Sequence, residues 1–112
     1  MIANRIKPTV APAISSDERL NQLVSSARQE LDDLIELPGP EIAADWSLDK
    51  DANGSPTIVL ELSDDMGSVR TVFSLDELEN DRQARRRLLA AWDDLLRIRS
   101  HKLYRKMLES DQ

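Results

Sequence analysis

The 112-residue sequence predicts an α+β fold: a helix, a three-stranded antiparallel meander and a long C-terminal helix (α-β-β-β-α), with both helices on one face of the sheet. Three observations predict it. Apolar residues recur at three- and four-residue intervals over 20–35, alternate with polar residues between 42 and 73, and return to helical spacing after residue 74. Because domains commonly hold about 100 to 150 residues, we expect a single domain, residues 15–112.

The N-terminal 14 residues contain Pro8 and Pro12 and show no regular period. We therefore expect a flexible N-terminal arm, or an extended segment that orders only on a partner. The first helix begins at Ser15, whose spacing from Glu18 is that of a capping box. The prolines of 38–40 end this helix, because proline lacks a backbone N–H and disfavours helical geometry in the residue before it.

The middle of the chain alternates apolar and polar residues over 42–48, 57–63 and 68–73. This is the period of strands that bury one face. The segments between them, 50–56 and 64–67, are turn-rich and short enough for hairpins. The three strands are therefore expected to pair as an antiparallel meander, with Asp45, Glu61 and Arg70 on its polar face.

The last helix has the best local start signal in the chain. Ser74 and Glu77 are spaced as a capping box, and Phe73 and Leu78 as a hydrophobic staple. Because Asn80 and the aspartate after it can cap a fresh helix, residues 75–108 form either one helix or two.

Composition excludes several classes of protein. The chain is 40% hydrophobic and 32% charged, too apolar for a wholly disordered chain and too charged for a membrane protein. It has no signal-like apolar stretch and no cysteine, so we expect a cytoplasmic location and no membrane partner. The only histidine is His101, and no phosphate loop, nucleophile elbow or His/Cys cluster is present. We therefore expect no enzyme, no cofactor and no small-molecule substrate.

Charge is divided unevenly along the chain. Residues 1–81 carry 6 Lys and Arg against 17 Asp and Glu, a net charge of −11, whereas residues 82–112 carry 9 against 4, a net charge of +5. The basic element is therefore the C-terminal helix, and the remainder of the chain is acidic.

An acidic motif lies between the first two strands. Asp49-x-Asp51-x-Asn53-Gly54 copies the opening of a calcium-binding EF-hand loop, in which alternate oxygen ligands and a glycine surround the ion. The twelfth position, which should supply a glutamate, is Leu60, and the flanks are strands. Asp, Asn and Gly also suit a hairpin turn, so we expect no metal and interpret the three candidate ligands as an acidic turn.

Cations gather on the expected C-terminal helix. The candidate electrostatic or nucleic-acid contacts are Arg82, Arg85, Arg86, Arg87, Arg97, Lys102, Arg105 and Lys106. Some of them, such as Arg82 and Arg86, lie at helical spacing and would form a ridge toward phosphates, with salt-dependent binding. In the alternative, the acidic part of this chain or of a neighbouring subunit pairs with them.

The order of elements over residues 17–100 resembles the topology of double-stranded-RNA-binding domains, and Arg82-Gln83-Ala84-Arg85 looks like the basic start of their second helix. The first hairpin, 49–56, is acidic and lacks the Gly-Pro-x-His loop of that family, so it would repel phosphates. The resemblance is one of topology.

Apolar residues on the last helix also follow alternating three- and four-residue steps, forming a seam that suits pairing with another helix. The predicted partner contacts are Trp92, Leu96, Arg99, Leu103 and Met107. Residues 103–108 would extend beyond a three-stranded sheet. Arg99 within the seam would need an acid across the interface, because a buried unpaired charge is costly.

These observations predict a small non-catalytic intracellular interaction protein. It would act as an accessory subunit or adaptor of a larger assembly, either self-associating or bound to a protein partner. An antitoxin-like neutraliser, which masks a basic partner, is one specific version. The alternative is an RNA- or DNA-binding module that uses the basic C-terminal helix.

Overall fold

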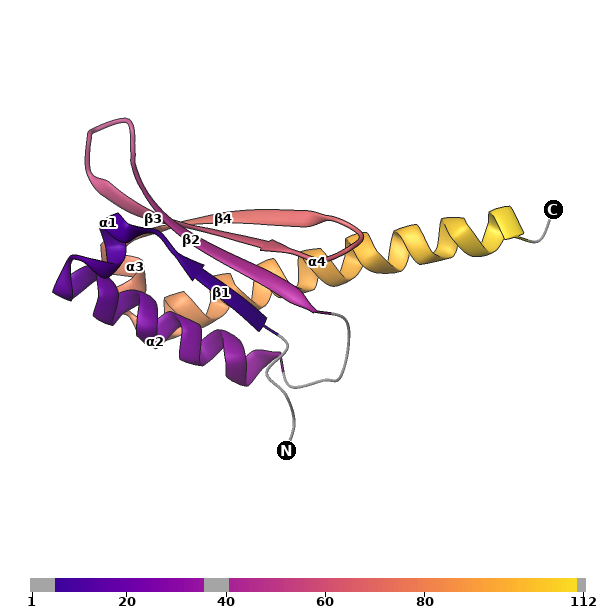
Figure 1. Cartoon of the computed structure of the whole chain (residues 1–112), viewed down its shortest axis with the longest axis horizontal. Helices are drawn as coiled ribbons and strands as arrows, with labels where there is room; N and C mark the ends of the chain where they lie inside the picture. The colour runs from indigo at the N-terminus through magenta and orange to yellow at the C-terminus, as the bar shows by residue number, and fades with distance from the viewer. Residues whose placement is uncertain (1–5, 36–40, 111–112) are drawn as a thin grey trace.

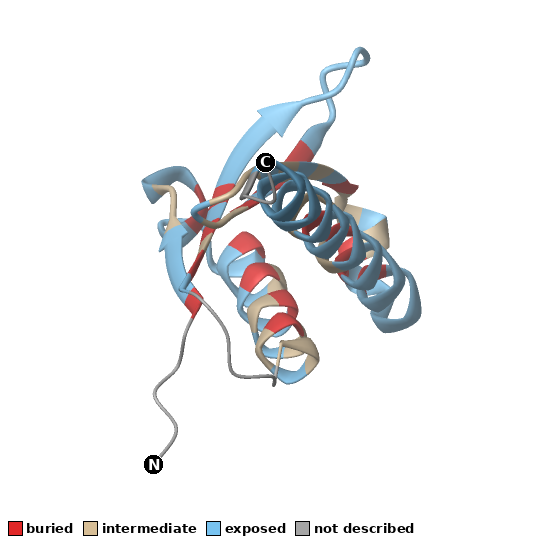
Figure 2. Cartoon of the chain, turned by 90° about the vertical axis from the view of Figure 1, so that its right-hand side faces the viewer, coloured by how far each residue is buried: buried red, intermediate tan, exposed pale blue. Residues whose placement is uncertain are grey.

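A four-stranded mixed sheet with helices packed on one face forms the framework of the molecule (Figure 1). The computed structural model describes residues 6–35 and 41–110. In chain order the elements are β1 (Ile6–Val10), α1 (Pro12–Ser15), α2 (Glu18–Leu34), β2 (Ile42–Lys50), β3 (Pro56–Ser63), β4 (Ser68–Ser74), α3 (Leu75–Glu79) and α4 (Asp81–Ser110). The α+β class and the long C-terminal helix are confirmed, and α2 and α4 lie side by side under the sheet (Figure 2).

The prediction of a three-stranded antiparallel sheet is wrong, because residues 6–10, expected to belong to a flexible arm, form a fourth strand. This strand, β1, runs parallel to β2, with Ile6 beside Ile42 and Val10 beside Trp46. Residues 1–5 lie outside the described residues. So do the prolines of 38–40, which the sequence predicts to end the first helix.

Pro8 sits in the middle of β1 without disturbing the sheet. The backbone N–H of Ala11 donates to the carbonyl of Trp46 at 2.9 Å. Because backbone groups of alternate residues face the same neighbour, the nitrogen of Pro8 points away from β2. Proline therefore costs the ladder no hydrogen bond at this edge of the sheet, and it blocks the pairing of another strand there.

Helix α2 begins later than the sequence predicts. Its N-cap is Asp17, whose carboxylate accepts from the backbone N–H of Leu20 at 3.1 Å, while Ser15 ends the short helix α1. The four fully buried positions of α2 are Leu20, Val24, Ala27 and Leu31. This spacing places one apolar stripe against the sheet, as the periodicity predicts.

The antiparallel pairs β2–β3 and β3–β4 are confirmed. The side chains that point toward the helices include Trp46 and Phe73, whose ring centroids lie 6.3 Å apart. On the opposite face, Asp45, Glu61 and Arg70 are exposed, as predicted, and lie in one row across three strands. The described helices leave this outer face of the sheet open (Figure 2).

The C-terminal region forms two helices. Ser74 and Glu77 make both bonds of the predicted capping box at the start of α3. Asn80 then caps α4, because its side-chain oxygen accepts from the backbone N–H of Gln83 at 3.1 Å. Within residues 6–35 and 41–110, no helix is both long and apolar enough to cross a membrane.

Candidate protein-interaction surface

Helix α4 carries two apolar rows, and only one of them belongs to the core. The inward row is buried against the sheet and α2 and consists of Ala84, Leu88, Ala91 and Leu95. These residues repeat at alternating four- and three-residue steps, so they lie on one side of the helix. Along this row, α4 is therefore packed against the sheet and α2.

A second row faces solvent. Leu89 is 50% exposed, Leu96 39% and Leu103 41%. Seven residues are nearly two helical turns, so these leucines, here called the leucine row, lie along one flank of α4. The sequence pattern merges the two rows into a single stripe, because Leu88 and Leu95 are each followed directly by a leucine of the outer row.

Trp92 lies between the two rows. It is partly buried and packs against the core, so it is only in part available to a partner. Leu96, Leu103 and Met107 are exposed, as a contact surface requires. Three of the five predicted contacts therefore lie open on α4, whereas Trp92 and Arg99 are engaged within the chain.

The last turns of α4 extend beyond the sheet (Figure 1). Residues 103–109, here called the overhang, are all exposed. Their apolar members are Leu103, Tyr104, Met107 and Leu108. By helical geometry these four lie on the side of α4 opposite the inward row, and the cations Arg105 and Lys106 lie on the other side. The overhang is therefore amphipathic, and its apolar side faces away from the body.

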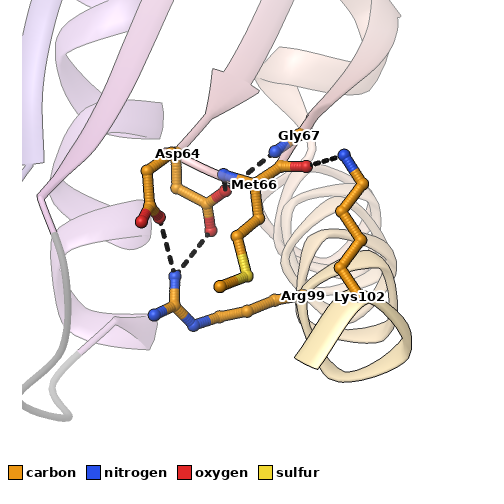
Figure 3. A network of polar contacts seen from close by, with 6 residues as sticks. Asp64, Met66, Gly67, Arg99 and Lys102 are labelled. Carbon is orange, nitrogen blue, oxygen red and sulfur yellow. Dashed lines mark hydrogen bonds and ion pairs between the residues drawn. The ribbon is translucent and has the colours of Figure 1, made fainter. Parts of the chain in front are cut away.

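The β3–β4 turn holds α4 just before the overhang (Figure 3). Arg99 Nη1 donates to Asp64 Oδ2 at 3.3 Å and to Asp65 Oδ1 at 3.1 Å. The expectation that Arg99 requires an acid across an interface is therefore wrong, because two aspartates from the turn of its own chain supply it. The pair is stable because Asp64 also accepts from the backbone N–H groups of Met66 and Gly67.

Two further contacts fix the same point. The ammonium group of Lys102 donates to the carbonyl oxygen of Met66 (Figure 3). A Cβ added at Gly67 would lie 2.7 Å from Cγ2 of Ile98, so the turn can approach α4 this closely only with glycine. The turn and α4 are therefore in direct contact at residues 98–102.

Some of the predicted cations form ion pairs within the described residues, and others are exposed without one. Arg87 pairs with Glu77 and donates to the carbonyl of Val72 at 3.0 Å, and Arg97 pairs with Asp93 at 3.1 Å. Three arginines of the first turns are exposed and have no ion pair with another described residue: Arg82, Arg85 and Arg86. The remaining cations Lys102, Arg105 and Lys106 line a shallow recess beside the turn, together with Asp65, Met66 and Glu109.

The pKa of Glu77 reflects its position in the capping box. Partial burial acts to raise this pKa, but the backbone N–H of Ser74 and the guanidinium of Arg87 outweigh burial and lower it. Glu77 therefore connects the start of α3 to the second turn of α4 as a carboxylate.

The acidic motif at the β2–β3 hairpin is used by the turn itself. Asp51 Oδ1 accepts from the backbone N–H groups of Asn53 and Ser55 at 2.8 and 2.9 Å, and Gly54 has a φ of 80°. Asp49 pairs with Arg70 at 3.7 Å. Among the described residues no group of three or more His, Cys, Asp or Glu is placed to hold a metal ion.

The five predicted contacts do not include the exposed apolar residues Leu89, Tyr104 and Leu108, and sequence reasoning missed Asp64 as the anchor of Arg99. The seven-residue spacing of the three leucines groups them into one row but does not tell that row from the core, because the buried Leu88 and Leu95 have the same spacing. No local signal identifies Asp64, because it lies 35 residues from Arg99 along the chain.

No protein family model matches this chain, and neither a curated protein nor a solved structure matches it.

Proposed function

We propose that this protein is a small non-catalytic interaction protein, an intracellular accessory subunit or adaptor that presents the outward face of α4 to a partner protein. The leucine row carries the proposal. Single exposed leucines are ordinary on protein surfaces, but three at seven-residue spacing form one of the two apolar rows with which helices pair. Since the inward row of α4 is already buried, this second row has no role in the core.

The way α4 is held supports the same function. Its inward row packs on the body, and the Asp64–Arg99 pair fixes it near the overhang. A binding helix that is ordered before it meets its partner loses less conformational entropy on binding. The chain therefore offers a preformed helix and not a segment that must fold on contact.

Recovery of the complex from cells that make the protein tests this function. The variant Leu96→Asp/Leu103→Asp places charges on the leucine row, and Val72→Asp is the control because Val72 is 42% exposed on the open face of the sheet. After crosslinking, we expect wild type and control to yield the same partner, or a dimer. The double variant should yield neither, although it should unfold at the same temperature as wild type. Recovery from all three proteins, or from none, contradicts the proposal.

A second function is favoured by a separate observation. Arg82, Arg85 and Arg86 are exposed on the first turns of α4 without an ion-pair partner among the described residues. Such a group suits phosphates and supports a nucleic-acid-binding module. The leucine row has no role in that function, so substitutions at the two places separate the alternatives.

A further inference from the structure

We infer that the partner of α4 is an acidic amphipathic helix and not a second copy of this chain. This inference rests on the proposed function and adds the chemistry of the partner. It follows from the charges that flank the leucine row and from the side of α4 on which the row lies.

The flanks of the leucine row are basic. In a helix, residues four before or three after a leucine lie along one flank, and the residue directly after it lies along the other. On the first flank these positions hold Arg85, Arg99 and Lys106 beside Trp92, and Arg99 is already paired with Asp64 and Asp65. On the second flank Arg97, which is paired with Asp93, lies between Ala90 and Tyr104. Neither flank carries an acidic side chain.

The one acid close to the row is already used. Asp93 lies between Leu89 and Leu96 on the outward face, and its carboxylate pairs with Arg97 at 3.1 Å. At the N-terminal end of the same face, Arg82 and Arg86 add two exposed cations. The outward face therefore offers leucines for apolar contact and a surplus of positive charge, the complement of a helix with leucine-like knobs and carboxylate flanks.

Pairing with a second copy would fit the leucines but not the charges. Because the three leucines are evenly spaced, an antiparallel copy centred on Leu96 would place Leu89 against Leu103. The same arrangement would bring Arg85 toward Lys106 of the second copy, whereas Arg97 of each copy is already neutralised by its own Asp93. A parallel copy brings no carboxylate to either flank. Like charges across an interface are unfavourable, so the row selects against self-pairing.

Two synthetic helical peptides test this inference by calorimetry. Both carry leucines at seven-residue spacing, and their flanking positions are glutamate in one and lysine in the other. We expect the glutamate peptide to bind at least about 100-fold more tightly than the lysine peptide, and its affinity to fall as salt is raised. Leu96→Asp/Leu103→Asp should abolish binding, and Arg82→Glu/Arg85→Glu/Arg86→Glu should weaken it, whereas Lys50→Glu at the hairpin tip should leave it unchanged.

The outcomes separate this inference from the proposed function. If sedimentation shows a dimer that the leucine substitutions dissociate, and the glutamate peptide does not bind, the inference is overturned but the interaction function is kept. Equal affinity for the two peptides also overturns it. If duplex RNA binds and the leucine substitutions do not weaken it, while neither peptide binds, both the inference and the interaction function fail.

Discussion

Arg99 on α4 donates to Asp64 in the β3–β4 turn across 3.3 Å, and the Asp64 side chain is only 3% exposed. The other oxygen of that carboxylate accepts from the backbone N–H groups of Met66 and Gly67. One aspartate thus closes the turn and anchors the helix. Because the overhang begins four residues after Arg99, this contact holds α4 close to the point at which it extends beyond the sheet.

Removing Asp64 should therefore cost more stability than removing its partner. We expect Asp64→Ala to lower the free energy of unfolding by about 2–3 kcal/mol, because two backbone N–H groups and a guanidinium lose their acceptor. Arg99→Met should cost about 1 kcal/mol. Asp65 is 68% exposed, so Asp65→Ala should change stability by less than about 0.5 kcal/mol. Urea denaturation measures all three, and equal losses at the two aspartates would contradict a special role for Asp64.

The close approach of Gly67 to Ile98 predicts a coupled pair. Gly67→Ala places a Cβ 2.7 Å from a methyl group of Ile98 and should cost about 1–3 kcal/mol through overpacking. Ile98→Ala removes that methyl group, so the double variant should be less destabilised than the two single losses combined. A double-mutant cycle in urea should give a coupling of at least about 0.5 kcal/mol, and strict additivity would show that the two residues do not touch.

Two adjacent leucines on α4 test the division into an inward and an outward row. Leu95 is fully buried, so Leu95→Ala should lower the free energy of unfolding by about 2–5 kcal/mol. Leu96 faces solvent, so Leu96→Ala should change it by less than about 0.5 kcal/mol. Thermal and urea unfolding of the two variants provide the comparison. Similar losses would mean that both leucines belong to the core.

The lowered pKa of Glu77 predicts how stability depends on pH. A carboxyl whose pKa is lower in the folded state stabilises the fold above its ordinary value of 4.5, and this contribution is lost as pH falls through the folded-state pKa. Glu77→Gln should therefore be less stable than wild type at neutral pH, and the difference should shrink in acid below pH 4.5. Urea denaturation across this pH range measures it. A constant difference would show that Glu77 acts through packing and not through its charge.

The open arginines allow a direct test of the nucleic-acid alternative. If duplex RNA or DNA binds, its affinity should fall steeply with salt, and Arg82→Ala/Arg85→Ala/Arg86→Ala should abolish binding and flatten the salt dependence. Arg97→Ala is the matched control, because Arg97 is paired with Asp93 on the same helix. Filter binding at two salt concentrations measures both. Binding that is absent, or indifferent to salt, excludes this function.

Much of the fold follows from local patterns. The strands β2, β3 and β4 and their antiparallel order are predicted by period-two alternation and short turns, and the start of α3 by one capping box. Strand β1 escapes prediction, because Pro8 and a length of five residues hide its alternation, and its partner β2 lies 36 residues further along the chain. Only the parallel pairing of Ile6 with Ile42 identifies it.

Some properties of the candidate surface likewise follow from the sequence, and others depend on the tertiary structure. By itself the sequence determined that α4 is long, basic and rich in leucine, since these properties depend on composition and helical period. The tertiary structure decided that Leu88 and Leu95 face the core and Leu89 and Leu96 face solvent, and that Arg99 finds its acids at Asp64 and Asp65. Adjacent residues on a helix point about 100° apart, so only the positions of the sheet, α2 and the β3–β4 turn around α4 decide which leucine row is buried.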